Sequence, residues 1–411
     1  MSASCRFCDT PLEHVFADLG KSPVANDLIK PEKLAGMEPF YPLKAYVCSS
    51  CLLVQLEDFQ PADELFDDDY LYLSSYSSSW LAHAKRYTEQ MIERFGFDSS
   101  SQVVELASND GYLLQYFVEA GVPVLGIEPA ANVAEIARGK GVDTIAEFFG
   151  VDTAREVVAS GKKADLLLGN NVLAHVPFIK DFVGGMKVLL ADDGVITMEF
   201  PQLLTQVQLM QWDTIYHEHF SYLSFLAVQK IFAAHDLRLF DVETLPTHGG
   251  SLRIYGCHAD DASKPDGPAV AEQLAREEAA GLRNLQTYLD FGPRVQADKR
   301  QIMAFMVEQK EAGKTIVGYG APAKGNTLLN YCGLGTDFLD YTVDRNPEKQ
   351  GRYLPGAQIP VMDPERIRET KPDIVLILPW NLREEVMEQM AYIREWGGSF
   401  AARAPELQLF P

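Results

Sequence analysis

Positive charge is scarce in this chain relative to negative charge. Its 411 residues include 36 Lys and Arg against 58 Asp and Glu, which gives a formal net charge of −22. Such a field repels nucleic-acid phosphates and anionic membranes, so we expect neither as a partner, although net charge says nothing about a single pocket. The N-terminus has no apolar signal region, and no apolar run is long enough to cross a bilayer. We therefore expect a cytosolic protein.

Internal repeats and low-complexity tracts are also missing. Apolar residues make up 47% and charged residues 23% of the chain, proportions that are ordinary for a folded protein. At this length one hydrophobic core is insufficient, so two or three domains are expected.

Cysteine is scarce and unevenly placed. Four of the six cysteines form two pairs, Cys5-x-x-Cys8 and Cys48-x-x-Cys51. In a reducing compartment such pairs are typical of a four-thiolate zinc site, and a redox Cys-x-x-Cys pair is the alternative. Four thiolates close the coordination sphere, so the zinc is expected to be structural. We assign residues 1–65 to this zinc-binding domain.

Strands and helices alternate in the rest of the chain, which predicts α/β architecture with two parallel sheets. A helix is expected to end near Phe95, and a helical stretch over about 269–312 separates the two units. A short link between two apolar runs, 238–244 and 251–255, predicts an antiparallel hairpin. The expected strands of the units are 102–106, 124–128, 165–168 and 194–200, then 315–319, 339–343, 374–378 and 399–402.

The first strand-to-helix loop suits a cationic nucleoside. Ala107 and Asn109 stand where a dinucleotide fold would need glycine, and Glu105 and Asp110 would repel a pyrophosphate. Glu128 ends the next strand, where a carboxylate suits the two hydroxyls of a ribose. These features favour S-adenosylmethionine as the ligand, and an ordinary βα turn is the alternative. The predicted cofactor-binding residues here are Glu105, Ala107, Asn109, Asp110 and Glu128.

The second such loop, Gly318 to Thr327, suits an anion. Its glycines, Lys324 and a helix N-terminus converge, and Asp344 and Arg345 close the following strand. Helix N-termini and lysines bind phosphate groups, so we expect the diphosphate of a nucleotide there. A nicotinamide dinucleotide site is the alternative.

Tyr216-His217-Glu218-His219 concentrates proton-transfer groups more than any other stretch. On an extended backbone the two histidines would share one face, with Tyr216 and Glu218 on the other. A histidine is then expected to meet the substrate. The alternatives are a metal-binding His-x-His pair and a polar surface turn.

These segments resemble the sugar C-methyltransferases that act on nucleotide-activated 4-keto deoxysugars, and the resemblance covers essentially the whole chain. The segments that carry it are the two Cys-x-x-Cys pairs, Tyr-x-Tyr-x-Ser-Ser at 70–75, Glu-Leu-Ala-Ser-Asn-Asp-Gly at 105–111, Asn-Asn-Val-Leu-Ala-His at 170–175, Glu-Phe-Pro at 199–201, Tyr-His-Glu-His at 216–219, His-Gly-Gly-Ser-Leu-Arg at 248–253 and Gly-Tyr-Gly-Ala-Pro-Ala-Lys-Gly-Asn-Thr at 318–327.

The resemblance implies a zinc-binding domain, a class I methyltransferase domain (66–260) and a second Rossmann-like domain (261–411) that helps to bind the nucleotide sugar. It implies that His219 is the general base, that Tyr216, Glu218 and His175 are further active-site groups, and that Tyr70 is a substrate-side tyrosine. Asn170 is implied to bind the cofactor. The residues implied to bind the substrate are Tyr72, Asn171, Glu199, Lys324, Asn326 and Arg345.

The predicted reaction is therefore methylation at C3 of a nucleotide-diphosphate 4-keto deoxysugar. A ketone at C4 acidifies the C3 proton, so a histidine could remove it, and donors could stabilise the resulting enolate. The alternatives are an NAD-dependent nucleotide-sugar oxidoreductase and a non-catalytic scaffold. The nucleotide, the exact sugar, the stereochemistry and the oligomeric state are not encoded in any recognisable pattern.

Overall fold

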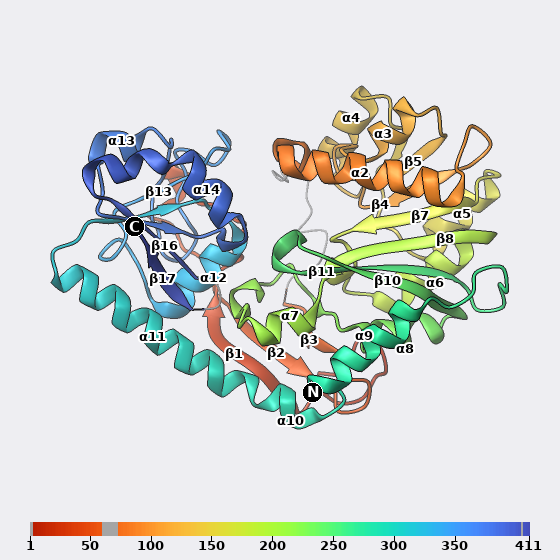
Figure 1. The fold of residues 1–411 in the computed structure, drawn as a ribbon, viewed down its shortest axis with the longest axis horizontal. Helices are drawn as coiled ribbons and strands as arrows, with labels where there is room; N and C mark the ends of the chain where they lie inside the picture. Colours follow the sequence, from red (N-terminus) through yellow and green to blue (C-terminus); the bar gives the residue numbers. More distant parts are fainter. Residues whose placement is uncertain (1–2, 60–72, 404–405) are drawn as a thin grey trace.

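The computed structural model of the protein describes residues 3–59, 73–403 and 406–411. Figure 1 shows two α/β lobes side by side, with the N-terminal strands and a long helix, α11 (Phe291–Glu311), running beneath them. No helix within the described ranges is long and apolar enough to cross a membrane. The fold class expected from the sequence is confirmed.

The N-terminal module contains a small antiparallel sheet in the order β1-β2-β3-β9. Its strands are β1 (His14–Ser22), β2 (Tyr41–Val47), β3 (Val54–Leu56) and β9 (Ser221–Tyr222). The fourth strand comes from the middle of the chain and directly follows the Tyr-His-Glu-His segment. The zinc-binding module and this segment therefore share one sheet, which the sequence pattern does not reveal.

The first lobe contains a seven-stranded sheet in the order β10-β11-β8-β7-β4-β5-β6. The pairs among β8, β7, β4, β5 and β6 are parallel, while β11 pairs antiparallel with both β8 and β10. The predicted hairpin is thus confirmed. Its strands are β4 (Val103–Leu106), β5 (Val124–Ile127), β6 (Thr144–Ile145), β7 (Ala164–Asn170), β8 (Leu190–Pro201), β10 (Leu237–Leu245) and β11 (Ser251–His258).

Helices accompany this sheet. The first, α2 (Ser78–Phe95), begins where the Ser77 side chain accepts a hydrogen bond from the Trp80 amide, and it ends at Gly96, whose φ is +75°. The predicted end of this helix near Phe95 is confirmed. The others are α3 (Leu114–Glu119), α4 (Ala131–Gly139), α5 (Val151–Ala159), α6 (Ile179–Leu189), α7 (Leu203–Gln208), α8 (Phe225–Ala233) and α9 (Pro268–Ala279). The short helix α10 (Leu285–Leu289) contacts β1 and α11.

The second lobe contains a six-stranded sheet in the order β14-β13-β12-β15-β16-β17, parallel except for β17. Its strands are β12 (Ile316–Tyr319), β13 (Thr342–Val343), β14 (Val361–Met362), β15 (Ile374–Ile377), β16 (Ser399–Arg403) and β17 (Leu407–Phe410), and its helices are α12 (Ala323–Cys332), α13 (Arg366–Thr370) and α14 (Arg383–Gln389).

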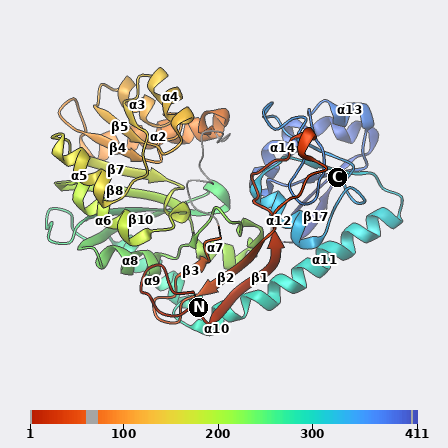
Figure 2. The same cartoon turned by 180° about the vertical axis from the view of Figure 1, so that it is seen from behind.

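The segment between β1 and β2 crosses to the second lobe, as the view from behind shows (Figure 2). Ile29 forms a β-bridge with Tyr353, and the Gly356 amide donates to the Glu38 carboxylate at 2.7 Å. The N-terminal module therefore contacts both lobes.

Candidate active site

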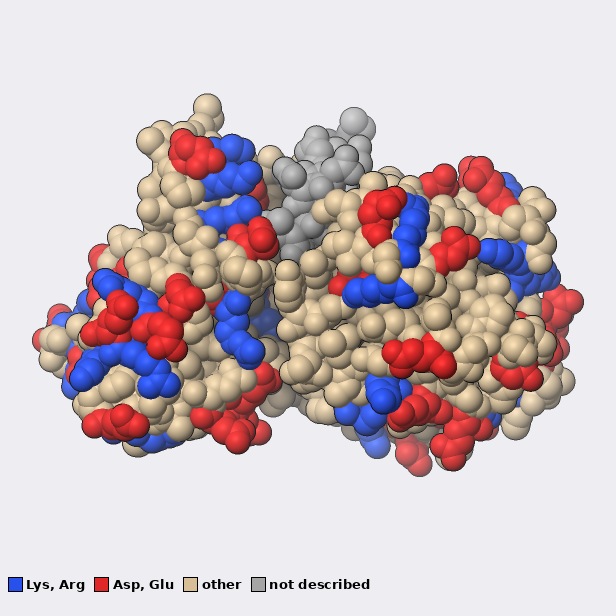
Figure 3. Space-filling model, turned by 90° about the horizontal axis from the view of Figure 1, so that it is seen from above, with Lys and Arg blue, Asp and Glu red and all other residues tan. Residues whose placement is uncertain are grey.

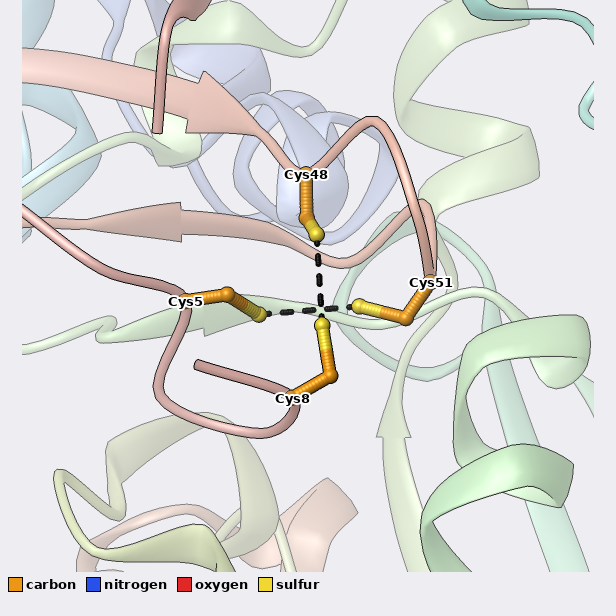
Figure 4. Close-up of side chains that lie close together, drawn as sticks. All are labelled: Cys5, Cys8, Cys48 and Cys51. Carbon is orange, nitrogen blue, oxygen red and sulfur yellow. Dashed lines mark hydrogen bonds between the residues drawn. The ribbon is translucent and has the colours of Figure 1, made fainter. Parts of the chain in front are cut away.

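Four cysteine sulfurs meet at one point in the N-terminal module (Figure 4). All four lie within 4.8 Å of one another, with Cys5–Cys51 at 3.6 Å and Cys8–Cys48 at 3.4 Å. Sulfurs on a tetrahedron with Zn–S bonds of about 2.3 Å lie roughly 3.8 Å apart, so the geometry suits zinc. The zinc prediction on these residues is thus supported by the fold.

A side-chain amide joins the zinc site to the shared sheet. Gln55 on β3 donates to the Cys5 sulfur at 3.2 Å and accepts from the Arg6 amide at 2.8 Å. Gln55 also pairs with Ser221 on β9. Hydrogen bonds to ligand sulfurs orient a metal site, and the strand that makes this contact pairs with the strand that follows the Tyr-His-Glu-His segment.

A cavity of about 840 Å³ opens at the carboxyl ends of β4, β5 and β7. This edge is where open α/β sheets bind ligands. Six residues predicted from the sequence line it, and they are Ala107, Asn109, Glu128, Asn170, Asn171 and His175. Aromatic side chains form much of the remaining wall, and they are Phe59, Trp80, Tyr112, Phe148, Phe149, Phe178 and Phe182.

Glu128 is held rigidly at the floor of this cavity. Its two carboxylate oxygens accept hydrogen bonds of 3.0 Å from the amides of Asn109 and Ala130. Asn109, whose backbone amide makes one of these hydrogen bonds, has a left-handed conformation with φ of +50°. Each carboxylate oxygen retains a lone pair, so Glu128 can still accept from two ligand hydroxyls. The side-chain Nδ2 of Asn170 and Oδ1 of Asn171 have no hydrogen-bond partner within the described part of the chain, which leaves them available to a ligand.

Two predicted cofactor residues lie behind the wall. Glu105 is fully buried on β4, and burial raises the pKa of its carboxyl well above the ordinary value. Asp110 forms an ion pair with Lys140 at 2.9 Å. Neither is among the described residues that line the cavity. Their roles as direct ligands of a cofactor remain predictions.

The Tyr-His-Glu-His segment is a turn, so the expected extended backbone is wrong. The His219 amide donates to the Tyr216 carbonyl at 2.9 Å, which closes the turn. As a result Tyr216 and His219 meet, whereas His217 and Glu218 point elsewhere. Alternation of faces holds only for strands, and a turn of this kind brings residues three positions apart together.

His219 is buried and held at both ring nitrogens. Nδ1 lies 3.0 Å from the Thr214 carbonyl oxygen, and Nε2 lies 2.7 Å from the Tyr216 hydroxyl. Because a carbonyl can only accept, Nδ1 carries the proton, and Nε2 accepts from Tyr216. Burial lowers the pKa of His219 well below its usual range. The imidazole is therefore neutral at physiological pH, with its basic nitrogen beside a phenol.

Further groups with proton-transfer chemistry surround His219. The His175 ring packs edge-on against it, with centroids 4.6 Å apart. Burial lowers the pKa of both His175 and His248 to about 4. Repulsion from the Lys324 ammonium adds to the lowering for His219 and His248. His175 and His248 also line the cavity, so the cluster stands at the wall of that cavity.

The other two members of the segment contact the N-terminal module. The His217 Nε2 donates to the Pro42 carbonyl at 3.2 Å, away from His219. The Glu218 Oε1 accepts from the side-chain amide of Asn26 at 2.9 Å, and its Oε2 has no hydrogen-bond partner in the described residues. Burial raises the pKa of Glu218.

A second hollow of about 1000 Å³ lies between residues 24–39 and the second lobe. Figure 3 shows Lys and Arg side chains beside the hollow that separates the lobes. Glu218 lines this cleft, and Ser74 lines both the cleft and the first cavity. The cleft is lined by five cations, which we call the basic cleft residues, and by five carboxylates. The cations are Lys30, Lys33, Arg345, Lys349 and Arg352, and the carboxylates are Asp27, Glu38, Glu218, Asp344 and Glu385.

Three predicted substrate residues, Glu199, Lys324 and Asn326, are not among the described residues that line either the cleft or the first cavity. The Lys324 ammonium is 2.8 Å from Asn381 Oδ1 and lies over the Trp380 ring. Asn326 is buried and donates to the Ala25 carbonyl. Glu199 is buried between His83 at 2.9 Å and Arg253 at 2.8 Å. These residues hold the walls of the site together.

Glu199 fixes several elements at once. Burial disfavours its charge, but the hydrogen bond from His83 and the charge of Arg253 outweigh burial and hold its pKa at about 2. Its other oxygen accepts from Thr247 at 2.7 Å, next to His248. The carboxylate thereby places His248 at the cavity wall.

Two predicted tyrosines, Tyr70 and Tyr72, lie outside the described residues. Sequence reasoning assigned no role to His248 or Trp80, although His248 stood in a segment that carried the resemblance. It also missed four of the basic cleft residues, all except Arg345. No local pattern signals these cations, because they come from two regions about 300 positions apart in the chain.

Comparison with known families matches the chain along most of its length. A zinc binding domain model matches residues 5–66, a methyltransferase domain model matches 80–242, and a C-methyltransferase C-terminal domain model matches 246–405. The C-methyltransferase NovU of Streptomyces niveus is 37% identical over 407 residues, which covers 98% of this chain and 95% of that protein.

Solved structures resemble part of the chain. Magnesium protoporphyrin IX methyltransferase from Synechocystis PCC 6803, with bound S-adenosylhomocysteine, is 14% identical over 47% of this chain and 91% of that one, with a TM-score of 0.35. An S-adenosylmethionine-dependent methyltransferase from Anabaena variabilis is 13% identical over 50% of this chain and 99% of that one, with a TM-score of 0.36. Likeness at this level does not identify an activity.

Proposed function

Because this chain belongs to the C-methyltransferase family that includes NovU, we propose that it methylates C3 of a nucleotide-diphosphate 4-keto deoxysugar. S-adenosylmethionine is the methyl donor, as the methyltransferase domain requires. The observation that carries the proposal is the place of His219 and its neighbours. His175, which packs against His219, lines the cavity that would take the donor, and Glu218, which precedes His219, lines the cleft that would take the sugar nucleotide.

The first cavity fits the donor. Glu128 would accept from the ribose hydroxyls, and the aromatic wall with Trp80 and Tyr112 would cover the apolar surface of an adenine. The free polar atoms of Asn170 and Asn171 would meet polar groups of the same ligand. Bound there, S-adenosylmethionine would supply an electrophilic methyl group.

The second cleft fits the nucleotide sugar. A diphosphate brings negative charge, and the basic cleft residues would neutralise it even though the whole chain is acidic. Glu218 lines the end of the cleft with one carboxylate oxygen lacking a hydrogen-bond partner in the described residues, so it would accept from a sugar hydroxyl. That contact would turn the sugar toward Tyr216 and His219.

The chemical step needs a base for the C3 proton. His219 Nε2 is unprotonated because Nδ1 donates to Thr214, and its low pKa keeps it so at neutral pH. It would take the proton from C3, and the electron pair of the C–H bond would move toward the C4 oxygen as an enolate. The Tyr216 hydroxyl, which lies 2.7 Å from that nitrogen, would turn to donate to the developing oxyanion. C3 then carries the nucleophilic electron pair.

The oxidoreductase alternative has less support, because the family models cover the chain with methyltransferase domains. A direct test supplies the enzyme with thymidine- and guanosine-diphosphate 4-keto deoxysugars and methyl-labelled donor. We expect labelled sugar nucleotide and S-adenosylhomocysteine in equal amounts. Nicotinamide reduction without methyl transfer would contradict the proposal.

A further inference from the structure

The carbonyl that fixes the tautomer of His219 belongs to a short 3-10 helix, η4 (Trp212–Thr214). From the first lobe, the side-chain amide of Gln206 on α7 donates to the Thr214 hydroxyl at 3.2 Å. The position of the Thr214 carbonyl oxygen depends on how η4 itself is held. Every residue of η4 is buried, and the side chain of Asp213 points away from His219 into the second lobe, where Arg403 lies.

Arg403 is the last residue of β16 and is only 4% exposed. Its Nη1 donates to Asp213 Oδ1 at 2.9 Å, and its Nε and Nη2 donate to Asp298 Oδ2 at 3.0 and 2.7 Å. Nη2 also donates to the carbonyl of Met210, and the guanidinium lies over the Trp212 ring. Arg403 thus contacts η4 at Asp213 and Trp212 and binds the carbonyl of Met210 just before it.

Two indole groups complete this network. Trp380 Nε1 donates to Asp213 Oδ2 at 2.6 Å, and Trp212 Nε1 donates to Asp298 Oδ2 at 2.6 Å. On the far side, the Thr327 hydroxyl of α12 donates to the Ile215 carbonyl at 3.0 Å, one residue after η4. The second lobe therefore holds η4 through a network of buried charged groups. An unpaired buried charge is costly, so the positions of these groups are tightly constrained.

We propose that Arg403 is a positioning residue for methyl transfer: through Asp213 it holds η4 so that the Thr214 carbonyl accepts from His219 Nδ1 and leaves Nε2 as the base. The inference rests on the proposed function, in which His219 removes the C3 proton. It gives the second lobe a role in the chemical step in addition to binding nucleotide. Arg403 acts through η4 and touches neither substrate.

The test reads the tautomer directly. Protein labelled with ¹⁵N-histidine is studied by long-range ¹H–¹⁵N spectra, and the His219 signals are assigned by their loss in His219→Asn. We expect a protonated Nδ1 and an unprotonated Nε2 in the parent protein. Arg403→Lys keeps the positive charge but loses the planar guanidinium that contacts Asp213 and Asp298 together. We therefore expect a detectable fraction of His219 with the proton on Nε2.

Kinetics of the same variant complete the test. We expect the turnover number of Arg403→Lys to fall about 10–100-fold, the range for partners that orient a functional imidazole, with the dissociation constant of S-adenosylmethionine unchanged. Arg394→Met is the matched control: its guanidinium packs on Phe400 of the same strand and binds the Pro411 carbonyl, away from η4. It should change neither the tautomer nor turnover.

A folded Arg403→Lys protein with the parent tautomer overturns the proposal, whatever its turnover. If the tautomer changes and turnover does not, positioning stands and the assignment of His219 as base fails. Should Arg403→Lys not fold, Asp213→Asn replaces it, because the amide keeps the size of the side chain and an acceptor for Trp380. The same change of tautomer is then expected, and its absence in the folded protein refutes the inference.

Discussion

His219→Asn is the substitution that bears most directly on the chemistry. Asparagine approximates the shape of the imidazole near Cβ and can still meet the Thr214 carbonyl, but it cannot take up a proton. Loss of a general base lowers turnover by roughly 10²–10⁴-fold, which corresponds to about 3–5 kcal/mol of transition-state stabilisation. Binding of both substrates should persist, because the cavity and the basic cleft keep their lining residues.

The matched control is His217→Asn, which makes the same change at a second buried histidine two positions away. His217 donates to Pro42 in the N-terminal module and does not contact His219, so most of the activity should remain. The assay follows loss of deuterium from C3 of the sugar nucleotide in the absence of methyl donor. The parent and His217→Asn proteins should exchange it slowly, and His219→Asn should not. Exchange by His219→Asn at the parent rate would refute the assignment of the base.

The pH dependence of turnover is a second test of His219. The folded-state pKa of His219 is lowered by burial, so neutral imidazole prevails through neutral pH and is lost only as pH falls through that lowered value. Turnover should therefore be level around neutrality and fall in acid well below pH 6.5, the ordinary histidine value. A loss of turnover centred near that ordinary value would contradict the buried, neutral state.

Three further perturbations test the separate sites. Glu128→Gln should weaken S-adenosylmethionine binding about 10–100-fold in calorimetry, the loss expected for charge-assisted hydrogen bonds, whereas the exposed Glu135→Gln should not. Arg345→Met should raise the Michaelis constant of the sugar nucleotide and leave donor affinity unchanged, and Arg366→Met, an exposed arginine of the same lobe, is its control. Removing zinc with a chelator should release one metal per chain and should lower turnover before it lowers donor affinity. The reason is that β3 and β9 link the zinc site to the catalytic segment. Unchanged turnover in metal-free protein would count against that link.

The sequence predicts best what depends on neighbours along the chain. Both parallel sheets, the hairpin and the cysteine cluster follow from runs of apolar residues, a short link and local spacing. The contact between Tyr216 and His219 was missed because a four-residue polar segment does not reveal whether it is extended or turned. Glu199 was assigned to the substrate from the resemblance, and no local pattern signals its ion pair with Arg253, which lies 54 positions later.

Groups that converge from distant segments escape sequence reasoning for the same reason. The basic cleft combines lysines of the N-terminal module with cations of the second lobe, and contacts such as the β-bridge between Ile29 and Tyr353 bring those regions together. The hold of Arg403 on η4 joins residues 190 positions apart. Charge composition even argues against such a cleft, because the chain as a whole is strongly acidic.

The identity of the methylated atom tests the central claim most directly. The enzyme is incubated with a nucleotide 4-keto deoxysugar and S-adenosylmethionine that carries a ¹³C-methyl group, and the product is examined by carbon–proton correlation spectra. We predict a new carbon–carbon bond that joins the labelled methyl to C3, with loss of the C3 proton. A methyl group on an oxygen or on any other carbon of the sugar would contradict the account.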